Sequence, residues 1–345
     1  MVDASGADEA TAAPEAVGPD PELFAALEAT LLGQAPHLTR PEVLERAGVS
    51  FEHAHGLWLS LGFPPPESDE SRVFTDADVE AIRMLGGLID GGLVDSRLEF
   101  ALTRSMGRSF ARLAEWEIAE VGAAVLASDE ALALDRVDAI VEAALPTLEK
   151  LQNYVWRRHL AAAAGRLLLQ ATTEESTLMA VGFADIVGYT RRTRSLDAEE
   201  LGEMVEHFEE GVNLLIAEHG ARIIKTIGDE VLFVCDDPVA AARLGLALVM
   251  AHEEDEEFPE IRVGMAHGQV LSRLGDVFGE VVNIAARLTS LARPGRILIN
   301  RDLADLVRAH DEEFRVRRAP SRPVKGYSRL ETWALKQPKK PRGVG

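Results

Sequence analysis

The sequence predicts an α+β protein whose helical first half precedes a half that mixes strands and helices. Over residues 21–150, apolar side chains recur mainly every three or four positions, which is the period of amphipathic helices. After the polar stretch Thr172-Thr173-Glu174-Glu175 the period changes, and short strand patterns alternate with helical ones. The 345 residues leave room for two domains of ordinary size.

Composition and turn residues divide the first half. Residues 1–20 are rich in Ala, Asp, Glu, Gly and Pro, which predicts a disordered tail before a helical domain over 21–150. Within that domain, residues 37–85 predict a helix, a turn at Gly48 and a second helix, and they resemble a degenerate form of the winged helix-turn-helix of MerR-type regulators. We expect Pro146 to interrupt the helical pattern and residues 151–172 to form a linker helix.

The second half, residues 173–338, predicts strands and helices in a defined order. The expected elements are a strand at Leu178–Ile186, a helix at Asp197–Gly220, a hairpin of Ala221–Ile227 and Glu230–Cys235, a helix at Pro238–Glu253, a strand at Ile261–Ser272, a helix at Val282–Arg293 and a strand at Arg296–Asn300. The core order β-α-β-β-α-β is the ferredoxin-like split βαβ arrangement. A basic tail, residues 339–345, follows.

Charge and composition exclude several classes of protein. The formal net charge of -21 argues against non-specific binding to nucleic acid or anionic membranes, because both require an excess of Lys and Arg. Cys235 is the only cysteine, so an intrachain disulfide and a Cys-based zinc cluster are excluded. No apolar run of 18 residues or more is present, and the N-terminus lacks the features of a signal peptide. We therefore expect a cytoplasmic protein that does not bind membranes.

Two motifs each place an aspartate at the end of an apolar strand pattern. They are Phe183-Ala184-Asp185-Ile186-Val187-Gly188-Tyr189-Thr190 and Ile224-Lys225-Thr226-Ile227-Gly228-Asp229-Glu230. A lone Asp after a strand commonly opens a turn or caps a helix. Two of them at the ends of adjacent strands can instead hold a pair of hard divalent cations through oxygen ligands. The pair Asp185 and Asp229 therefore predicts a phosphoryl-transfer site.

Three further stretches follow in the second half: Gly275-Asp276-Val277-Phe278-Gly279-Glu280-Val281-Val282-Asn283, Ile284-Ala285-Ala286-Arg287-Leu288 and Pro323-Val324-Lys325-Gly326. In this order the motifs resemble the catalytic domain of class III nucleotidyl cyclases over about residues 175–338. The short segment between Gly268 and Phe278, with the soluble N-terminal half, is most similar to the actinobacterial subgroup that includes pH-sensing adenylate cyclases. The resemblance implies formation of 3′,5′-cyclic AMP and pyrophosphate from ATP, by attack of the ribose 3′-hydroxyl on the α-phosphate.

The resemblance also implies roles for particular residues. The metal site for two divalent cations, Mg²⁺ or Mn²⁺, would comprise Asp185, Ile186 and Asp229. The triphosphate would contact backbone N–H groups of Ile186, Val187, Gly188, Tyr189 and Thr190, with Lys325 at its terminal phosphates. In isolation, Lys325 would be interpreted as an ordinary solvated lysine.

The remaining implied residues act on the base and the ribose. Lys225 and Asp276 match the adenine-selecting pair, because an ammonium can donate to adenine N1 and a carboxylate can accept from the N6 amino group. Asn283 and Arg287 are four residues apart and so share a helix face. They match the pair that orients the ribose and stabilises the transition state. In isolation, Arg287 would be interpreted as a surface arginine paired with an acid.

Family members pair two catalytic domains head to tail, so the resemblance implies a homodimer with two active sites at its interface. The helical domain would regulate the reaction, with His159 in the linker and His207 on the first catalytic helix as candidates for a pH response. An alternative is a DNA-binding transcriptional regulator with a nucleotide-sensing C-terminal domain. The acidic residues around Arg40, Arg46, Arg72 and Arg83 argue against nucleic acid as a partner. A catalytically dead nucleotide sensor is disfavoured because no expected catalytic group is missing.

Overall fold

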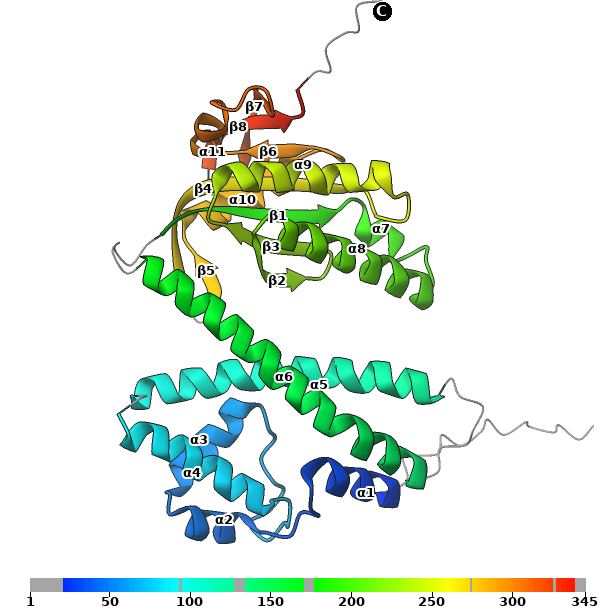
Figure 1. Ribbon diagram of the computed structural model, residues 1–345, viewed down its shortest axis with the longest axis vertical. Coiled ribbons are helices and arrows are strands. Elements are labelled where there is room, and N and C mark those ends of the chain that lie inside the picture. Colours follow the sequence, from blue (N-terminus) through cyan, green and yellow to red (C-terminus); the bar gives the residue numbers. More distant parts are fainter. Residues whose placement is uncertain are drawn as a thin grey trace, which may run out of the picture. The chain divides into compact units, whose positions relative to one another are not determined.

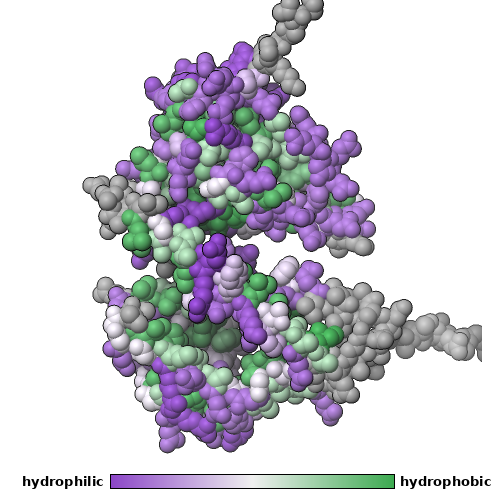
Figure 2. Space-filling model, viewed as in Figure 1, coloured by the Kyte–Doolittle hydropathy of each residue, from purple (hydrophilic) through white to green (hydrophobic). Residues whose placement is uncertain are grey.

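The computed structural model describes residues 21–92, 95–126, 134–170, 177–273, 275–324 and 327–338 (Figure 1). Contacts divide the chain into two compact units, with the boundary between Ala163 and Ala164. Within the described ranges, no helix is long and apolar enough to cross a membrane. Hydrophilic side chains cover most of the face shown in Figure 2, with smaller groups of hydrophobic side chains among them.

The first unit is helical. Its helices are α1 (Pro21–Leu32), α2 (Arg40–Ala47), α3 (Phe51–Leu61), α4 (Asp76–Asp90), α5 (Ser96–Leu126) and α6 (Leu134–Gln170), the last of which runs on into the second unit. Thr39 and Glu42 form a capping box at the start of α2, and Gly48 ends that helix in the left-handed region with φ 70°. Ser50 then caps α3. The predicted helix, glycine turn and second helix are therefore present.

The predicted interruption at Pro146 is wrong, because α6 continues through that residue. A proline inside a helix removes one backbone hydrogen bond and costs about 3 kcal/mol. The helix has 37 residues, and the remaining bonds on both sides of Pro146 maintain it. The predicted linker region therefore begins inside a longer helix that ends at Gln170.

The second unit is built on one mixed sheet in the order β2-β3-β1-β4-β6-β8-β7, with β5 paired to β4 alone. Its elements are β1 (Thr177–Ile186), α7 (Tyr189–Arg192), α8 (Ala198–Glu218), β2 (Arg222–Ile227), β3 (Glu230–Cys235), α9 (Pro238–Glu254), β4 (Ile261–Arg273), β5 (Asp276–Phe278), α10 (Glu280–Leu291), β6 (Ile297–Ile299), α11 (Arg301–Val307), β7 (Arg315–Val324) and β8 (Tyr327–Lys336). The predicted split βαβ core is confirmed.

Strand β1 is buried along most of its length and contributes to a core on each face of the sheet. Ala180, Ala184 and Ile186 pack with α8, α9 and α11 on one face. The alternate residues Met179, Val181 and Phe183 pack with α10 on the other face. The sequence of β1 reads as a continuous apolar run because both of its faces are covered.

The sequence analysis missed the short elements α7, α11 and β5 and the hairpin of β7 and β8. Strand β7 has the sequence RVRRAPSRPV, whose arginines and prolines are typical of loops. Its pairing with β8 at the sheet edge, interrupted by two register shifts, accommodates both prolines. Strand β7 forms because β8 supplies its hydrogen bonds, and this pairing cannot be predicted from the sequence of β7 alone.

Candidate active site

Three charged side chains lie beside one another across neighbouring strands. Asp185, the next-to-last residue of β1, is opposite Glu230 of β3 on one side and opposite Arg262 of β4 on the other. Directly opposed residues of antiparallel strands project from the same face. That face is the one covered by α10. Residues two positions away on the same strands, such as Phe183 on β1 and Leu232 on β3, belong to the core that includes α10.

Arg262 is the cationic partner of Asp185. Its Nε and Nη2 lie 2.6 and 2.5 Å from Oδ2 of Asp185, whose side chain is only 12% exposed. Burial raises the pKa of Asp185, and the nearby Asp229 adds to that rise, while the hydrogen bond and charge of Arg262 oppose it. The net direction is upward.

Asp229 lies in the tight turn between β2 and β3. Gly228 before it has φ 62°, a conformation that favours glycine, and the carbonyl of Asp229 accepts a hydrogen bond from the N–H of Ile186 at 3.1 Å. The turn is thereby fixed against the end of β1. Burial, together with the charges of Asp185 and Asp229, raises the pKa of Glu230 to about 7.

The residues around Asp185 fit divalent cations by their chemistry. Three carboxyl groups influence one another here, and Arg262 is the cation that lowers the pKa of both Asp185 and Glu230. Carboxylate oxygens in excess over cationic side chains are the ligand set that Mg²⁺ and Mn²⁺ take. Ile186 has an aliphatic side chain, so its main-chain carbonyl is the group that could serve as a ligand.

The segment after β1 has only some of its N–H groups available. The N–H of Ile186 donates to Asp229, and the N–H of Val187 donates to the carbonyl of Glu260 at 2.8 Å. Gly188, with φ 72°, precedes the single turn of α7. Three successive N–H groups, those of Gly188, Tyr189 and Thr190, have no backbone acceptor within the described part of the chain and lie at the start of that turn.

Lys225 and Asp276 form a direct pair. Nζ of Lys225 lies 2.6 Å from Oδ2 of Asp276, although 51 residues separate them in the sequence. Partial burial raises the pKa of Asp276, but hydrogen bonds from Lys225 and from the N–H of Val277 outweigh it, so the net pKa is lowered. The pair thus presents one donor group and one ionised acceptor group side by side.

Asn283 and Arg287 lie on α10, one turn apart. The buried side of that helix is formed by Val281, Ala285, Leu288 and Thr289. Asn283 is exposed and Arg287 is half-buried, and neither side chain makes a hydrogen bond or ion pair within the described part of the chain. Both groups are therefore free to contact a ligand or another chain.

The sheet fixes the position of α10 through a close backbone approach. A Cβ on Gly264 of β4 would lie 2.1 Å from the main-chain nitrogen of Thr289 and 2.6 Å from the carbonyl oxygen of Ala285. Only glycine leaves room for this contact. The helix that carries Asn283 and Arg287 therefore rests directly on the strand that carries Arg262.

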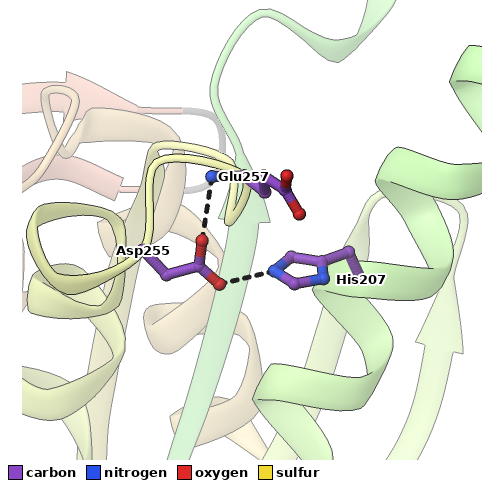
Figure 3. A group of neighbouring side chains, drawn as sticks. All are labelled: His207, Asp255 and Glu257. Atoms are coloured by element: carbon purple, nitrogen blue, oxygen red, sulfur yellow. Dashed lines mark hydrogen bonds and ion pairs between the residues drawn. The ribbon is translucent and has the colours of Figure 1, made fainter.

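Lys325 lies outside the described residues. His159 is exposed on α6 and makes no hydrogen bond or ion pair with the described part of the chain. His207, on α8, is held by Asp255 instead, with Nε2 2.6 Å from Oδ2 (Figure 3). The pKa of Asp255 is lowered, first by the hydrogen bond from His207 and then by the N–H of Glu257.

His207, Asp255 and Glu257, whose side chains Figure 3 shows near one another, have possible ligand atoms within 4.8 Å of one another. Both oxygens of Asp255 already accept protein hydrogen bonds, from His207 and from the N–H of Glu257 at 3.0 Å. The group is therefore accounted for as a hydrogen-bonded cluster that joins α8 to the connection between α9 and β4.

Two residues of the site were missed by the sequence analysis as functional candidates. Glu230 directly follows Asp229, and this position at the end of the motif was the sequence feature that could have identified it as a site residue. Arg262 is 77 residues from Asp185 in the sequence. Only the register of β1 and β4 brings these two together.

The chain was compared with known proteins. The model of the "Adenylate and Guanylate cyclase catalytic domain" matches residues 171–337. An adenylate cyclase of Streptomyces coelicolor is 38% identical over 96% of this chain and 95% of its own length. An adenylate cyclase of Streptomyces griseus is 41% identical over 85% of this chain and 74% of its own length. A pH-sensitive adenylate cyclase of Mycobacterium tuberculosis is 28% identical over 84% of this chain and 74% of its own length.

Proposed function

The chain belongs to the adenylate and guanylate cyclase family and is an adenylate cyclase, and on this premise we propose how its residues convert ATP to 3′,5′-cyclic AMP and pyrophosphate. The observation that carries the assignment of ATP is the contact between Lys225 and Asp276. Lys225 would donate to adenine N1, and Asp276 would accept from the N6 amino group. Guanine presents a donor at N1 and an acceptor at O6. The Lys225 ammonium would then face a donor and the Asp276 carboxylate an acceptor, so neither would form its hydrogen bond.

The carboxylates at the strand ends support a site for two divalent cations, Mg²⁺ or Mn²⁺. Asp185, Asp229 and the carbonyl of Ile186 would hold them. When bound, such cations lower the pKa of the ribose 3′-hydroxyl and neutralise charge on the departing phosphates. The burial of Asp185 and the high pKa of Glu230 support this proposal, because both indicate negative charge with too few cationic partners.

Other residues would bind and orient the rest of the substrate. The N–H groups of Gly188, Tyr189 and Thr190 are suited to hold phosphate oxygens, and Lys325 would add a positive charge at the terminal phosphates. Asn283 would orient the ribose. Arg287 would stabilise the charge that develops on the transferred phosphoryl group, a role that can contribute on the order of 10³-fold in rate.

We propose that the active enzyme is a homodimer with two active sites at its interface. Asn283 and Arg287 have no partner within the described part of their own chain, which leaves them available to a site completed by a second copy. An isologous dimer of this kind would create two equivalent sites.

The helical unit would control this reaction. We propose a cytoplasmic location, because ATP, the substrate, is present there. A change of pH is the candidate input, supported by the pH-sensitive relative. His159 and His207 are the candidate groups. His207 has a defined partner in Asp255, so its protonation would strengthen the link between α8 and the end of α9.

The alternative of DNA binding receives no support from the helical unit. The arginines of its helix-turn-helix region are engaged by the protein itself. Arg40 pairs with Asp69, Arg46 with Asp76 and Arg72 with Glu42, while Arg83 donates to the carbonyl of Arg46. Side chains engaged in this way are not free to neutralise phosphates.

The proposal is tested by incubating the full chain with ATP and Mg²⁺ or Mn²⁺ and separating the products by chromatography. We expect cyclic AMP and pyrophosphate, and a loss of about 10³-fold or more in rate for Asp185→Ala and for Asp229→Ala. Asp236→Ala is the matched control, because Asp236 also follows a strand but is exposed. Near wild-type activity in either of the first two variants would contradict the metal assignment.

A further inference from the structure

Arg262 connects the metal-binding carboxylate to the helix that carries the other catalytic groups. Besides its two contacts with Oδ2 of Asp185, it donates from Nη1 to the carbonyl of Ser290 at 3.3 Å. Ser290 lies in the last turn of α10. The carbonyls of a last helical turn have no partner within the helix, and a cation there is favourable. One side chain therefore joins β1, β4 and α10.

The contact engages only one oxygen of Asp185. Both donors of Arg262 reach Oδ2, and Oδ1 accepts no N–H hydrogen bond within the described part of the chain. The side chain is buried, so its orientation is restricted. An oxygen that no N–H group engages, on a side chain that also interacts with the carboxyl of Asp229, is the arrangement expected of a carboxylate prepared for a cation.

The electrostatic surroundings give Arg262 a second effect. Asp185 is beside Glu230 and close to Asp229, and Arg262 acts against the mutual repulsion of these groups. A half-buried guanidinium that is always charged serves this purpose better than an exposed one, because water screens it less.

We propose that Arg262 is a positioning residue for metal binding. It fixes Oδ2 of Asp185 so that Oδ1 is presented to a divalent cation, and through Ser290 it keeps α10 in register with that carboxylate. This inference rests on the proposed function, which places a cation at Asp185 and Asp229. Removal of a residue that orients a metal ligand typically weakens metal binding by 10- to 100-fold.

The test measures Mn²⁺ binding directly, by electron paramagnetic resonance of the free ion, with the full chain in a buffer without nucleotide. Arg262→Gln should raise the Mn²⁺ dissociation constant about tenfold or more. Arg262→Lys should raise it at least about threefold, because a lysine keeps the charge but loses the planar fork. All titrations are repeated in a His207→Asn background, so that ions held by His207, Asp255 and Glu257 are not counted.

Arg243→Gln is the matched control. Arg243 also makes a two-point pair with a carboxylate of the same unit, at 2.7 and 2.9 Å from Glu313, and it is not part of the site. This variant should bind Mn²⁺ like the wild type. If Arg262→Gln does not fold, as judged by circular dichroism, the lysine variant decides the question.

Asp185→Asn separates the two levels of the inference. If it weakens Mn²⁺ binding while the Arg262 variants bind as the wild type does, the positioning role is wrong and the metal site stands. If Asp185→Asn leaves Mn²⁺ binding unchanged, the metal assignment fails and the role of Arg262 fails with it. Equal weakening in Arg262→Gln and Arg243→Gln would show a general loss of structure and would also overturn the proposal.

Discussion

Individual side chains in this enzyme obtain their chemical character from neighbours that are distant in the sequence. Asp276 is ionised more readily because Lys225 and the N–H of Val277 donate to it. Glu230, in contrast, has no cation in hydrogen-bond contact among the residues that the structure describes, and burial beside two other carboxylates raises its pKa to about 7. Two acidic residues of one unit therefore release their protons in different pH ranges.

Lys225→Met should reduce kcat/KM for ATP by about 10²-fold or more and should narrow the preference for ATP over GTP. The reason is that the variant removes the donor to adenine N1 and leaves Asp276 without its partner. Steady-state rates with each nucleotide check this. Lys150→Met, in an exposed position of α6, is the control. An unchanged ratio of ATP to GTP rates would contradict the role of the pair.

Glu230 should make the stability of the metal-free enzyme depend on pH. Its folded pKa of about 7 exceeds the ordinary value of 4.5, so the folded chain keeps a proton that the unfolded chain releases between these values. The free energy of unfolding should therefore fall as pH rises from about 4.5 to about 7 and should lose nothing further from this group above that range.

Glu230→Gln removes the group that titrates, so the variant should lose less stability than the wild type between about pH 4.5 and pH 7. The difference should be on the order of 1 kcal/mol after allowance for solvent screening. Urea denaturation of both proteins in a chelating buffer measures it. Glu206→Gln, on the exposed side of α8, should behave like the wild type. Parallel pH profiles for Glu230→Gln and the wild type would refute the prediction.

At the scale of elements, the contact between α10 and β4 decides where the helix lies. The buried Thr289 donates to the carbonyl of Ala285 at 2.9 Å and to that of Phe183 at 3.4 Å, so the helix is also bonded to β1. The approach at Gly264 brings the backbones of α10 and β4 together. The packing of α10 against β4 and β1 therefore sets the positions of Asn283 and Arg287, whose side chains make no hydrogen bonds within the described part of the chain.

Gly264→Ala should therefore destabilise the second unit by about 1 to 3 kcal/mol, because the new methyl group meets the backbone of Thr289. Activity should fall as well, since α10 must move away from the sheet. Gly268→Ala is the control on the same strand. A Cβ there would meet only Val281, at 3.4 Å, and should cost less than about 1 kcal/mol. Equal unfolding midpoints for the two variants would argue against the close approach.

At the scale of the whole molecule, the proposed dimer allows two inactive chains to restore each other. Asp185→Ala and Arg287→Ala chains should each be inactive alone and recover about a quarter of wild-type activity when mixed in equal amounts. Half of the dimers would then be mixed, and each of these would contain one complete site.

The control for this experiment is a mixture of Asp185→Ala with a chain that carries both substitutions, which contains no complete site. Exchange of subunits is verified with differently tagged chains. If exchange occurs and activity does not return, each active site is built within a single chain and the dimer interface has another role.

The sequence alone determined the fold class and the family, and it was sufficient to propose the central pairs of the site. Strand and helix periods are local, so the split βαβ core could be predicted, and the Asp, Lys, Asn and Arg positions lay in motifs that are short in sequence. Two features could not be predicted in this way. Helix α6 continues through Pro146 because its own hydrogen bonds on both sides of that residue maintain it, and the Arg-rich strand β7 forms because it pairs with β8, which outweighs its local propensity.

Only the tertiary structure decided which groups act on one another. The register of β1 with β3 and β4 brings Glu230 and Arg262 to either side of Asp185. Register depends on hydrogen bonds between strands that are far apart in the chain, and a shift of one residue would turn these side chains to the opposite face. Burial then raises the pKa of Glu230, an effect that no residue pattern shows because it arises from the atoms packed around the group.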